Sequence, residues 1–272
     1  MSSDENQNDL ILLKQVPIVL RARGFRLYTA NGRRLIDLWL NGGAAILGHT
    51  PPNMLRELKN TASRGLYAPF PHFTEERLKK ALLKLFPQHN FRLYSSPPEE
   101  LILLFKSKDA KIWRPFTNPE SPFETDHKEG VFIPALPGIQ AWRNELPFGL
   151  CIAAAKSETQ LESLQVSENL SPILLAMAAR GIYDLLASPE RGKPKFPRVF
   201  KALKNSIWER KGIYLSLKKE TNAKEWGTLF CHFLEKGFLL PPNPSQPIIL
   251  PGELSDGEEA KLASCLIQMT SP

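Results

Sequence analysis

The sequence has few of the features that mark extracellular or membrane proteins. It has three cysteines, each within an apolar run and far from the others, namely Cys151, Cys231 and Cys265. We interpret them as buried thiols in a reducing compartment, because disulfide frameworks and zinc sites use closer and more regular spacings. The richest apolar run, residues 146–155, is about half as long as the ~20 residues of a membrane span. We therefore expect no membrane association.

Signals for secretion and for metal binding are also missing. Residues 1–9, MSSDENQND, are polar and acidic, whereas a signal peptide is basic and then apolar. We therefore expect a cytoplasmic protein. The histidines do not have the spacing of metal ligands, so the sequence predicts no metal site. They are His49, His72, His89, His127 and His232.

The charge balance is basic, with a net charge of +7 and a pI near 9.3. A basic adaptor for nucleic acid is therefore one hypothesis, and it predicts retention on DNA or RNA that weakens as salt is added. The lysines and arginines are spread along the chain rather than gathered in one patch. This distribution disfavours a nucleic-acid partner.

The clearest local signal is a β-hairpin within residues 23–52, RGFRLYTANGRRLIDLWLNGGAAILGHTPP, where apolar residues flank Asn31-Gly32 on both sides. An Asn-Gly pair between such runs predicts a type I′ turn, which needs a positive φ at both central residues. After the hairpin, we expect Asp37 to form local hydrogen bonds. We expect His49 to be a satisfied turn or interface histidine.

Helix and strand signals alternate along the rest of the chain. Apolar periodicity and capping residues predict helices over residues 52–64, 74–86, 172–186, 196–210, 226–236 and 255–269. Thr74 and Ser171 are the expected N-caps of two of them, and Gly212 is expected to end the helix over 196–210. Short strands are expected at residues 91–94, 131–133, 148–155, 213–217, 238–240 and 248–250. This order predicts an α/β fold.

The hairpin region resembles the opening of class III aminotransferases, in particular the glutamate-1-semialdehyde aminomutase branch. The matching residues are Gly24, Gly32, Ile36, Asp37, Leu47, Gly48, His49 and Pro52. Later stretches resemble later parts of the same family, at residues 146–158, 175–188, 230–242 and 255–259. The resemblance keeps the family's order and reaches both ends of the chain.

The resemblance implies the fold-type-I fold of pyridoxal-phosphate enzymes, reduced in size. That fold has a large domain with a mainly parallel sheet, a small α/β domain built from both chain ends, and a homodimeric assembly. Residues 10–52 would join the small domain, residues 53–188 would form a reduced large domain, and residues 189–272 would complete the small domain. The chain is short between Ser96 and Leu146, where the family keeps most of its large-domain strands and its chemistry.

The same resemblance does not bring the family's catalytic groups with it. The family lysine that binds pyridoxal phosphate as a Schiff base falls on Gln140, whose amide cannot form one. No acid in residues 131–135, VFIPA, is available to pair with the pyridinium nitrogen. The phosphate-binding turn falls on Ser95-Ser96, and the partner-subunit threonine falls on Ser167 or Asn169. These four residues are the candidates for a vestigial phosphate site.

Two main hypotheses follow. The first is a pseudoenzyme: a dimeric, aminotransferase-like protein without transaminase chemistry and without a cofactor, which serves as a binding or partner protein. The second is an active pyridoxal-phosphate-dependent aminotransferase or aminomutase with an unrecognised lysine. The small-molecule ligand is left open under both hypotheses.

Overall fold

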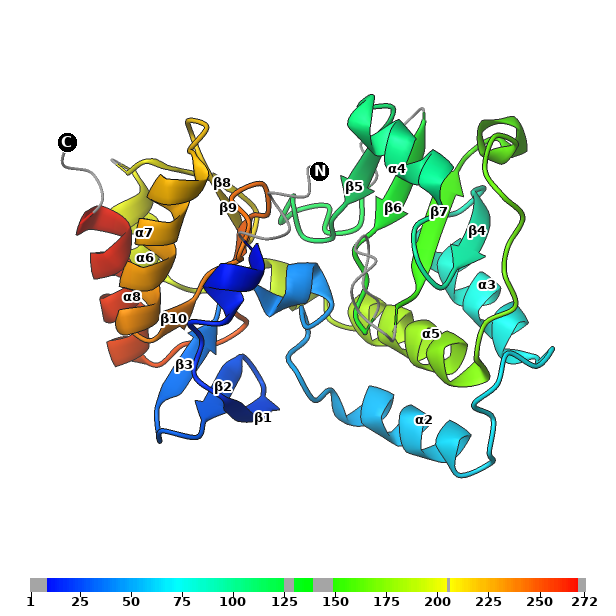
Figure 1. The fold of residues 1–272 in the computed structure, drawn as a ribbon, viewed down its shortest axis with the longest axis horizontal. Helices are drawn as coiled ribbons and strands as arrows, with labels where there is room; N and C mark the ends of the chain where they lie inside the picture. The colour runs from blue at the N-terminus through cyan, green and yellow to red at the C-terminus, as the bar shows by residue number, and fades with distance from the viewer. Residues whose placement is uncertain (1–8, 125–129, 139–148, 205, 269–272) are drawn as a thin grey trace. The chain divides into compact units, whose positions relative to one another are not determined.

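The computed structural model describes residues 9–124, 130–138, 149–204 and 206–268. Within-chain contacts divide the chain into two compact units. Unit 1 consists of residues 1–49 and 190–272, and unit 2 consists of residues 50–189 (Figure 1). None of the described helices has both the length and the apolar character that a membrane crossing requires.

Unit 1 contains two sheets. The first has the order β1-β2-β3-β10 and is built from β1 (Val19–Arg23), β2 (Arg26–Thr29), β3 (Arg34–Asp37) and β10 (Phe238–Leu239). The second has the order β11-β9-β8 and is built from β8 (Trp208–Lys211), β9 (Tyr214–Leu217) and β11 (Ile248–Ile249). Strand β10 runs parallel to β3, whereas β1, β2 and β3 form an antiparallel meander. Because β3 and β10 come from opposite ends of the sequence, unit 1 is built from both chain ends.

The helical segments of unit 1 follow the sequence signals in most places. They are the 3-10 helices η1 (Leu40–Gly43) and η3 (Pro189–Gly192), the latter at the unit boundary, and the α-helices α6 (Pro197–Leu203), α7 (Ala223–Glu235) and α8 (Asp256–Gln268). The expected capping box of the last helix is present, since the Glu258 backbone N–H donates to Ser255 Oγ and the Ser255 backbone N–H donates to the Glu258 carboxylate. Helix α6 packs against α8.

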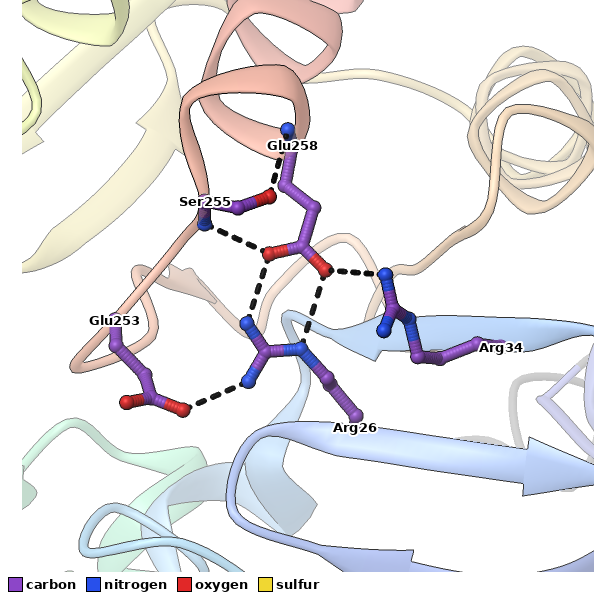
Figure 2. A network of polar contacts seen from close by, with 5 residues as sticks. All are labelled: Arg26, Arg34, Glu253, Ser255 and Glu258. Carbon is purple, nitrogen blue, oxygen red and sulfur yellow. Dashed lines mark hydrogen bonds and ion pairs between the residues drawn. The ribbon is translucent and has the colours of Figure 1, made fainter.

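A charged network joins α8 to the hairpin strands (Figure 2). Arg26 of β2 donates two hydrogen bonds to the Glu258 carboxylate, at 3.1 and 2.8 Å, and one to Glu253 at 2.7 Å. Arg34 of β3 lies 3.2 Å from the same Glu258 carboxylate. Hydrogen bonding from Arg26 lowers the pKa of Glu258 to about 2. The residue that caps α8 therefore also fixes the helix to β2.

Unit 2 contains one four-stranded sheet with helices around it. The sheet has the order β4-β7-β6-β5 and is built from β4 (Asn90–Tyr94), β5 (Ala110–Trp113), β6 (Val131–Pro134) and β7 (Cys151–Ala155). Strand β7 is antiparallel to both β4 and β6, and β5 is parallel to β6. Three of the four strands therefore point the same way and β7 alone is reversed. The helical segments are α2 (Pro52–Ala62), α3 (Thr74–Leu85), α4 (Glu99–Lys106), η2 (Glu158–Leu161) and α5 (Pro172–Leu186).

Both faces of this sheet are buried. On one face, Leu101 of α4 belongs to the apolar cluster that contains Val131, Ile133 and Ala153. On the other, Phe86 at the end of α3 meets Trp113 and Phe132 edge to face, with ring centroids 4.7 and 5.2 Å apart. Helix α5 packs against α2 and α3. Burial on both faces explains why the sequences of the two inner strands, β6 and β7, are continuous apolar runs.

The turn of the hairpin differs from the prediction. Only Gly32 has a positive φ, of 76°, so the two-residue type I′ turn is wrong. The Gly32 N–H donates to the Thr29 carbonyl, and the Thr29 N–H donates to the Arg33 carbonyl. This is the pattern of a three-residue loop that ends in a left-handed glycine. The Thr29 hydroxyl donates to Asn31 Oδ1 at 2.6 Å, a contact that favours the longer loop.

The predicted helix over residues 196–210 is also wrong. Helix α6 ends at Leu203, and Trp208 begins strand β8. Gly212, expected to end a helix, instead has a φ of 62° in the tight turn between β8 and β9. The apolar residues after Leu203 continue the helical spacing, but pairing of Trp208 with Leu217 across the hairpin decides their conformation. Long-range strand pairing overrides the local periodicity here.

Thr74 is the first residue of α3 rather than its N-cap, a position that Phe73 occupies without a side-chain cap. Ser171 is the N-cap of α5 as expected, although its side chain makes no capping hydrogen bond.

Candidate functional sites

Strand β4 and the segment after η2 bring the sequence-predicted phosphate residues together in unit 2. The Leu93 backbone N–H donates to Ser167 Oγ at 3.1 Å, and the Glu168 backbone N–H donates to the Leu93 carbonyl at 2.9 Å. The Tyr94 hydroxyl donates to the Gln165 carbonyl. Ser95 and Ser167 therefore lie at the same end of β4 within one chain, whereas the resemblance gave Ser167 or Asn169 the place of a threonine that comes from the partner subunit. Ser96 and Asn169 lie on the same two segments and are exposed.

The backbone of this turn has few N–H donors, and one of them is already used. The Ser95 backbone N–H donates to the Glu168 carboxylate at 2.9 Å. Residues 97 and 98 are prolines, which have no backbone N–H to offer. Helix α4 then begins with Glu99 and Glu100, so the surroundings of the turn are acidic. The Glu168 carboxylate thus accepts a hydrogen bond from a backbone N–H that would otherwise be available to a bound anion.

The buried groups beside the turn are held in their neutral forms. Burial raises the pKa of the Tyr94 hydroxyl to about 12. Burial, with a smaller contribution from the charge of Glu168, raises the pKa of the Cys151 thiol to about 12. The thiolate is the reactive form of cysteine, so Cys151 is an inert core residue at neutral pH. Neither group supplies a nucleophile or a base to this site.

With the Glu168 carboxylate in this position, the turn is a poor match for the phosphate of pyridoxal phosphate. A phosphate dianion needs several N–H or hydroxyl donors and a positive local field. The turn between β4 and α4 has two backbone N–H donors, those of Ser95 and Ser96, and the Ser95 donor is bonded to Glu168. Gln140, which falls in the slot of the family lysine, lies outside the described residues, as does the Leu146-Pro147 pair from which that slot is counted. Among the residues that the structure does describe, no three His, Cys, Asp or Glu side chains gather as a metal site would require.

A second polar cluster lies in unit 1, where β3 leads into η1. Asp37 is buried and uses both carboxylate oxygens. Its Oδ1 accepts hydrogen bonds from the backbone N–H groups of Trp39 and Leu40, at 2.8 and 2.9 Å, and its Oδ2 lies 2.8 Å from His49 Nε2. The structure therefore shows the local hydrogen bonds expected of Asp37, and it adds the pairing with His49, which sequence spacing did not indicate.

Close backbone packing brings His49 to this cluster. The His49 backbone N–H donates to the Gly24 carbonyl at 2.8 Å. Gly48 has a φ of 94°, and a Cβ there would lie 3.2 Å from the Gly24 Cα. Only glycine fits both conditions. The Gly-His pair in the sequence is therefore a packing requirement that sets the histidine opposite Asp37.

The backbone between Asp37 and His49 is strained. Four successive residues have a positive φ: 48° at Leu40, 49° at Asn41, 65° at Gly42 and 114° at Gly43. A buried leucine in this region is unusual, because the left-handed conformation costs a non-glycine residue about 1–2 kcal/mol. Asp37 holds the start of the strained turn, because its carboxylate accepts hydrogen bonds from the backbone N–H groups of Trp39 and Leu40. Residues of this kind gather at ligand and switch sites.

The fold is that of the pyridoxal-phosphate-dependent aminotransferases. The structure superimposes on the ornithine delta-aminotransferase of Plasmodium falciparum with a TM-score of 0.64 at 13% identity, covering 98% of each chain. It also superimposes on an omega-transaminase of Sphaerobacter thermophilus with a TM-score of 0.62 at 10% identity, covering 93% of this chain and 90% of that one. The fold predicted from the resemblance is therefore confirmed. Identities this low establish the fold alone.

Sequence relatives add little about activity. An uncharacterized protein of Borreliella burgdorferi is 26% identical over 254 residues, which is 92% of this chain and 90% of that protein. Glutamate-1-semialdehyde 2,1-aminomutase of Thermus thermophilus is 26% identical over 120 residues, which is 44% of this chain but 28% of the enzyme. No family model matches the chain.

Proposed function

We propose that this chain is a pseudoenzyme: a reduced, aminotransferase-like protein that has lost transaminase chemistry and acts as a cytoplasmic binding or partner protein, as a homodimer. One observation carries the proposal. The Glu168 carboxylate accepts the Ser95 backbone N–H at the turn where the family holds the cofactor's phosphate. The protein's own acid takes the place of the anion.

Electrostatic repulsion opposes the binding of a phosphate at this turn while the Glu168 carboxylate is in place. Two unit charges of the same sign at about 4 Å repel by about 4 kcal/mol near a protein surface. A phosphate group with nearly two negative charges would meet the Glu168 carboxylate at such a distance. Glu99 and Glu100, which follow the turn in the first turn of α4, add to the acidic surroundings. The turn could accept phosphate only if the Glu168 side chain moved away. Its backbone N–H is fixed to the Leu93 carbonyl, so only the side chain is free to move.

The proposed homodimer is supported by an exposed aromatic segment of unit 2. Between α2 and α3, the side chains of Tyr67, Phe70 and Phe73 are exposed, at 65%, 56% and 58%. Three large aromatic groups within seven residues are a typical core of a protein interface. Light scattering on the purified chain tests this part, and a monomer that stays monomeric at high concentration would count against it.

Titration with pyridoxal phosphate tests the loss of chemistry. Purified protein mixed with an equimolar amount of the cofactor should show no visible Schiff-base absorbance, and borohydride should fix no cofactor to the chain. Pyridoxal without phosphate serves as the control for adventitious reaction with surface lysines. A one-to-one adduct that maps to a single lysine would show that the chain binds the cofactor through a specific lysine, as the active enzymes do. The pseudoenzyme proposal would then be wrong.

Replacement of Glu168 tests the physical reason. Glu168→Ser removes the carboxylate and leaves a hydroxyl donor, so inorganic phosphate should bind this variant more tightly than it binds the parent chain. Glu162→Ser, an exposed acid on the same segment, is the matched control and should leave phosphate binding unchanged. If all three proteins bind phosphate equally, the turn is not a phosphate site and Glu168 does not block one.

A further inference from the structure

Unit 1 contains an open pocket of about 380 Å³ beside the strained turn. Its lining includes Leu13 and Val16 from the segment that precedes β1, Val19 of β1, Leu27 of β2 and Leu239 of β10. Trp39 also lines the pocket. At about 30 Å³ per water in the liquid, this volume corresponds to on the order of a dozen water-sized groups. The pocket is thus the size of a small ring with a substituent.

Polar side chains interrupt this apolar lining. Asp37, Asn41 and His49 also line the pocket. Asp37 takes part in three hydrogen bonds, whereas neither the Asn41 amide nor His49 Nδ1 has a hydrogen-bond partner among the described residues. Pairing of Nε2 with Asp37 fixes the orientation of the His49 ring. The indole N–H of Trp39 donates to Gln246, which leaves its ring face for packing.

Strain places Asn41 in this position. Asparagine tolerates the left-handed conformation better than most residues, and Asn41 adopts it with φ 49° and ψ 50°. The hydrogen bonds that hold the turn use the Asn41 carbonyl, which accepts from the Ala44 N–H, and leave the side-chain amide unused. The backbone is therefore fixed while the amide remains available to a ligand.

The charges of the lining select an uncharged ligand. No lysine or arginine lines the pocket, so an anion would find no permanent counter-ion there. The Asp37 side chain is only 3% exposed and already takes part in three hydrogen bonds, so it offers a cation little open carboxylate surface. An amide presents one donor and one acceptor side by side, and its natural complement is a second planar group with the same pair of functions.

We propose that this pocket binds a small uncharged molecule with an apolar ring and a planar carboxamide-like edge, the ring against Leu27, Val19 and Trp39 and the edge against Asn41 and His49. The proposal names a ligand class for the binding role proposed above. It does not depend on the lost chemistry, because the pocket lies in unit 1 and the phosphate turn lies in unit 2.

Benzamide is the probe, since it combines one ring with one carboxamide. It should bind with a dissociation constant in the millimolar range or tighter, measured by the shifts of backbone amide signals in nuclear magnetic resonance. The shifted signals should belong to residues 13–19, 27 and 39–41. Benzoate, benzylamine and toluene share the ring but change the edge, and each should bind at least tenfold more weakly. Tighter binding of benzoate or benzylamine would overturn the assigned ligand class.

Three variants test whether benzamide binds in this pocket or elsewhere on the protein. Asn41→Gly keeps the positive φ at no steric cost and removes the amide, so benzamide affinity should fall at least fivefold. Asn60→Ala, on the exposed face of α2, is the matched control and should bind as the parent does. Val19→Trp fills the pocket and should abolish binding while the spectrum remains that of a folded chain.

Unchanged affinity in Asn41→Gly, or amide shifts confined to unit 2, would refute the assigned site. The cofactor titration gives an independent answer: a lysine adduct with benzamide binding intact would refute the pseudoenzyme proposal and leave the pocket standing.

Discussion

Glu258 is the residue whose replacement best tests the packing of unit 1. Its carboxylate accepts two hydrogen bonds from Arg26, lies near Arg34 and accepts the Ser255 backbone N–H (Figure 2). Glu258→Gln keeps the size and one acceptor oxygen but removes the charge. We expect the variant to fold, because the capping interaction with Ser255 can persist, and to be less stable.

The pKa of Glu258 sets the size of the effect. It falls from an ordinary value of 4.5 to about 2, chiefly because Arg26 hydrogen-bonds the ionised form. One pKa unit is worth about 1.4 kcal/mol, so the upper limit is about 3.4 kcal/mol at neutral pH. The side chains of Arg26 and Glu258 are 16% and 12% exposed, so some solvent screening remains. We expect a loss of about 2 kcal/mol, within the range of hydrogen bonds to charged groups.

The pH dependence follows from the direction of the shift. A carboxylate whose pKa is depressed by folding stabilises the native state above its unfolded pKa of 4.5, and this contribution disappears as the pH falls towards 2. The difference between the parent chain and Glu258→Gln should therefore be full at pH 7. At pH 3 it should be less than half as large, or below about 1 kcal/mol.

Urea unfolding followed by circular dichroism at pH 7 and at pH 3 measures both values. Glu253→Gln is the matched control, because Glu253 makes one hydrogen bond to the same Arg26 but its side chain is 68% exposed. Exposed ion pairs contribute little, so this control should lose less than about 0.5 kcal/mol. Equal stability of Glu258→Gln and the parent chain at pH 7, or a difference that is larger at pH 3, would refute the reasoning.

Two glycine pairs give further tests by the same unfolding measurement. Gly181→Ala should lose about 1–3 kcal/mol, because its Cβ would lie 2.6 Å from the Pro137 carbonyl oxygen, whereas Gly257→Ala, with open space around it in α8, should gain up to about 1 kcal/mol. Gly32→Ala should lose about 1 kcal/mol from its positive φ alone. Gly48→Ala should lose clearly more, since it adds the contact with Gly24. A reversed order within either pair would contradict these packing arguments.

Local signals in the sequence identified the elements that depend on neighbouring residues. The capping box at Ser255 and Glu258 predicted the start of α8, because both partners lie within one helical turn. Gly237, with a φ of 88°, ends α7 as a left-handed glycine should. Such features need no information from elsewhere in the chain. Their physical cause is complete within a few residues.

Pairing between distant segments could not be predicted in the same way. Residues 208–211 form β8 because they pair with β9, although their apolar spacing continues that of α6. The candidate sites also depend on contacts between segments that are distant in the sequence. Ser95 meets Glu168, and Asp37 meets His49, through backbone packing that sequence spacing does not encode.

The sequence by itself therefore determined the local elements and, through its resemblance to class III aminotransferases, the fold. The tertiary structure decided which side chains meet. It placed a carboxylate on the Ser95 backbone donor of the phosphate turn, and it set an unused amide and an oriented imidazole in the lining of an apolar pocket. Charge and hydrogen-bonding capacity act over a few ångströms in space, so their effect depends on the folded positions rather than on the order of residues.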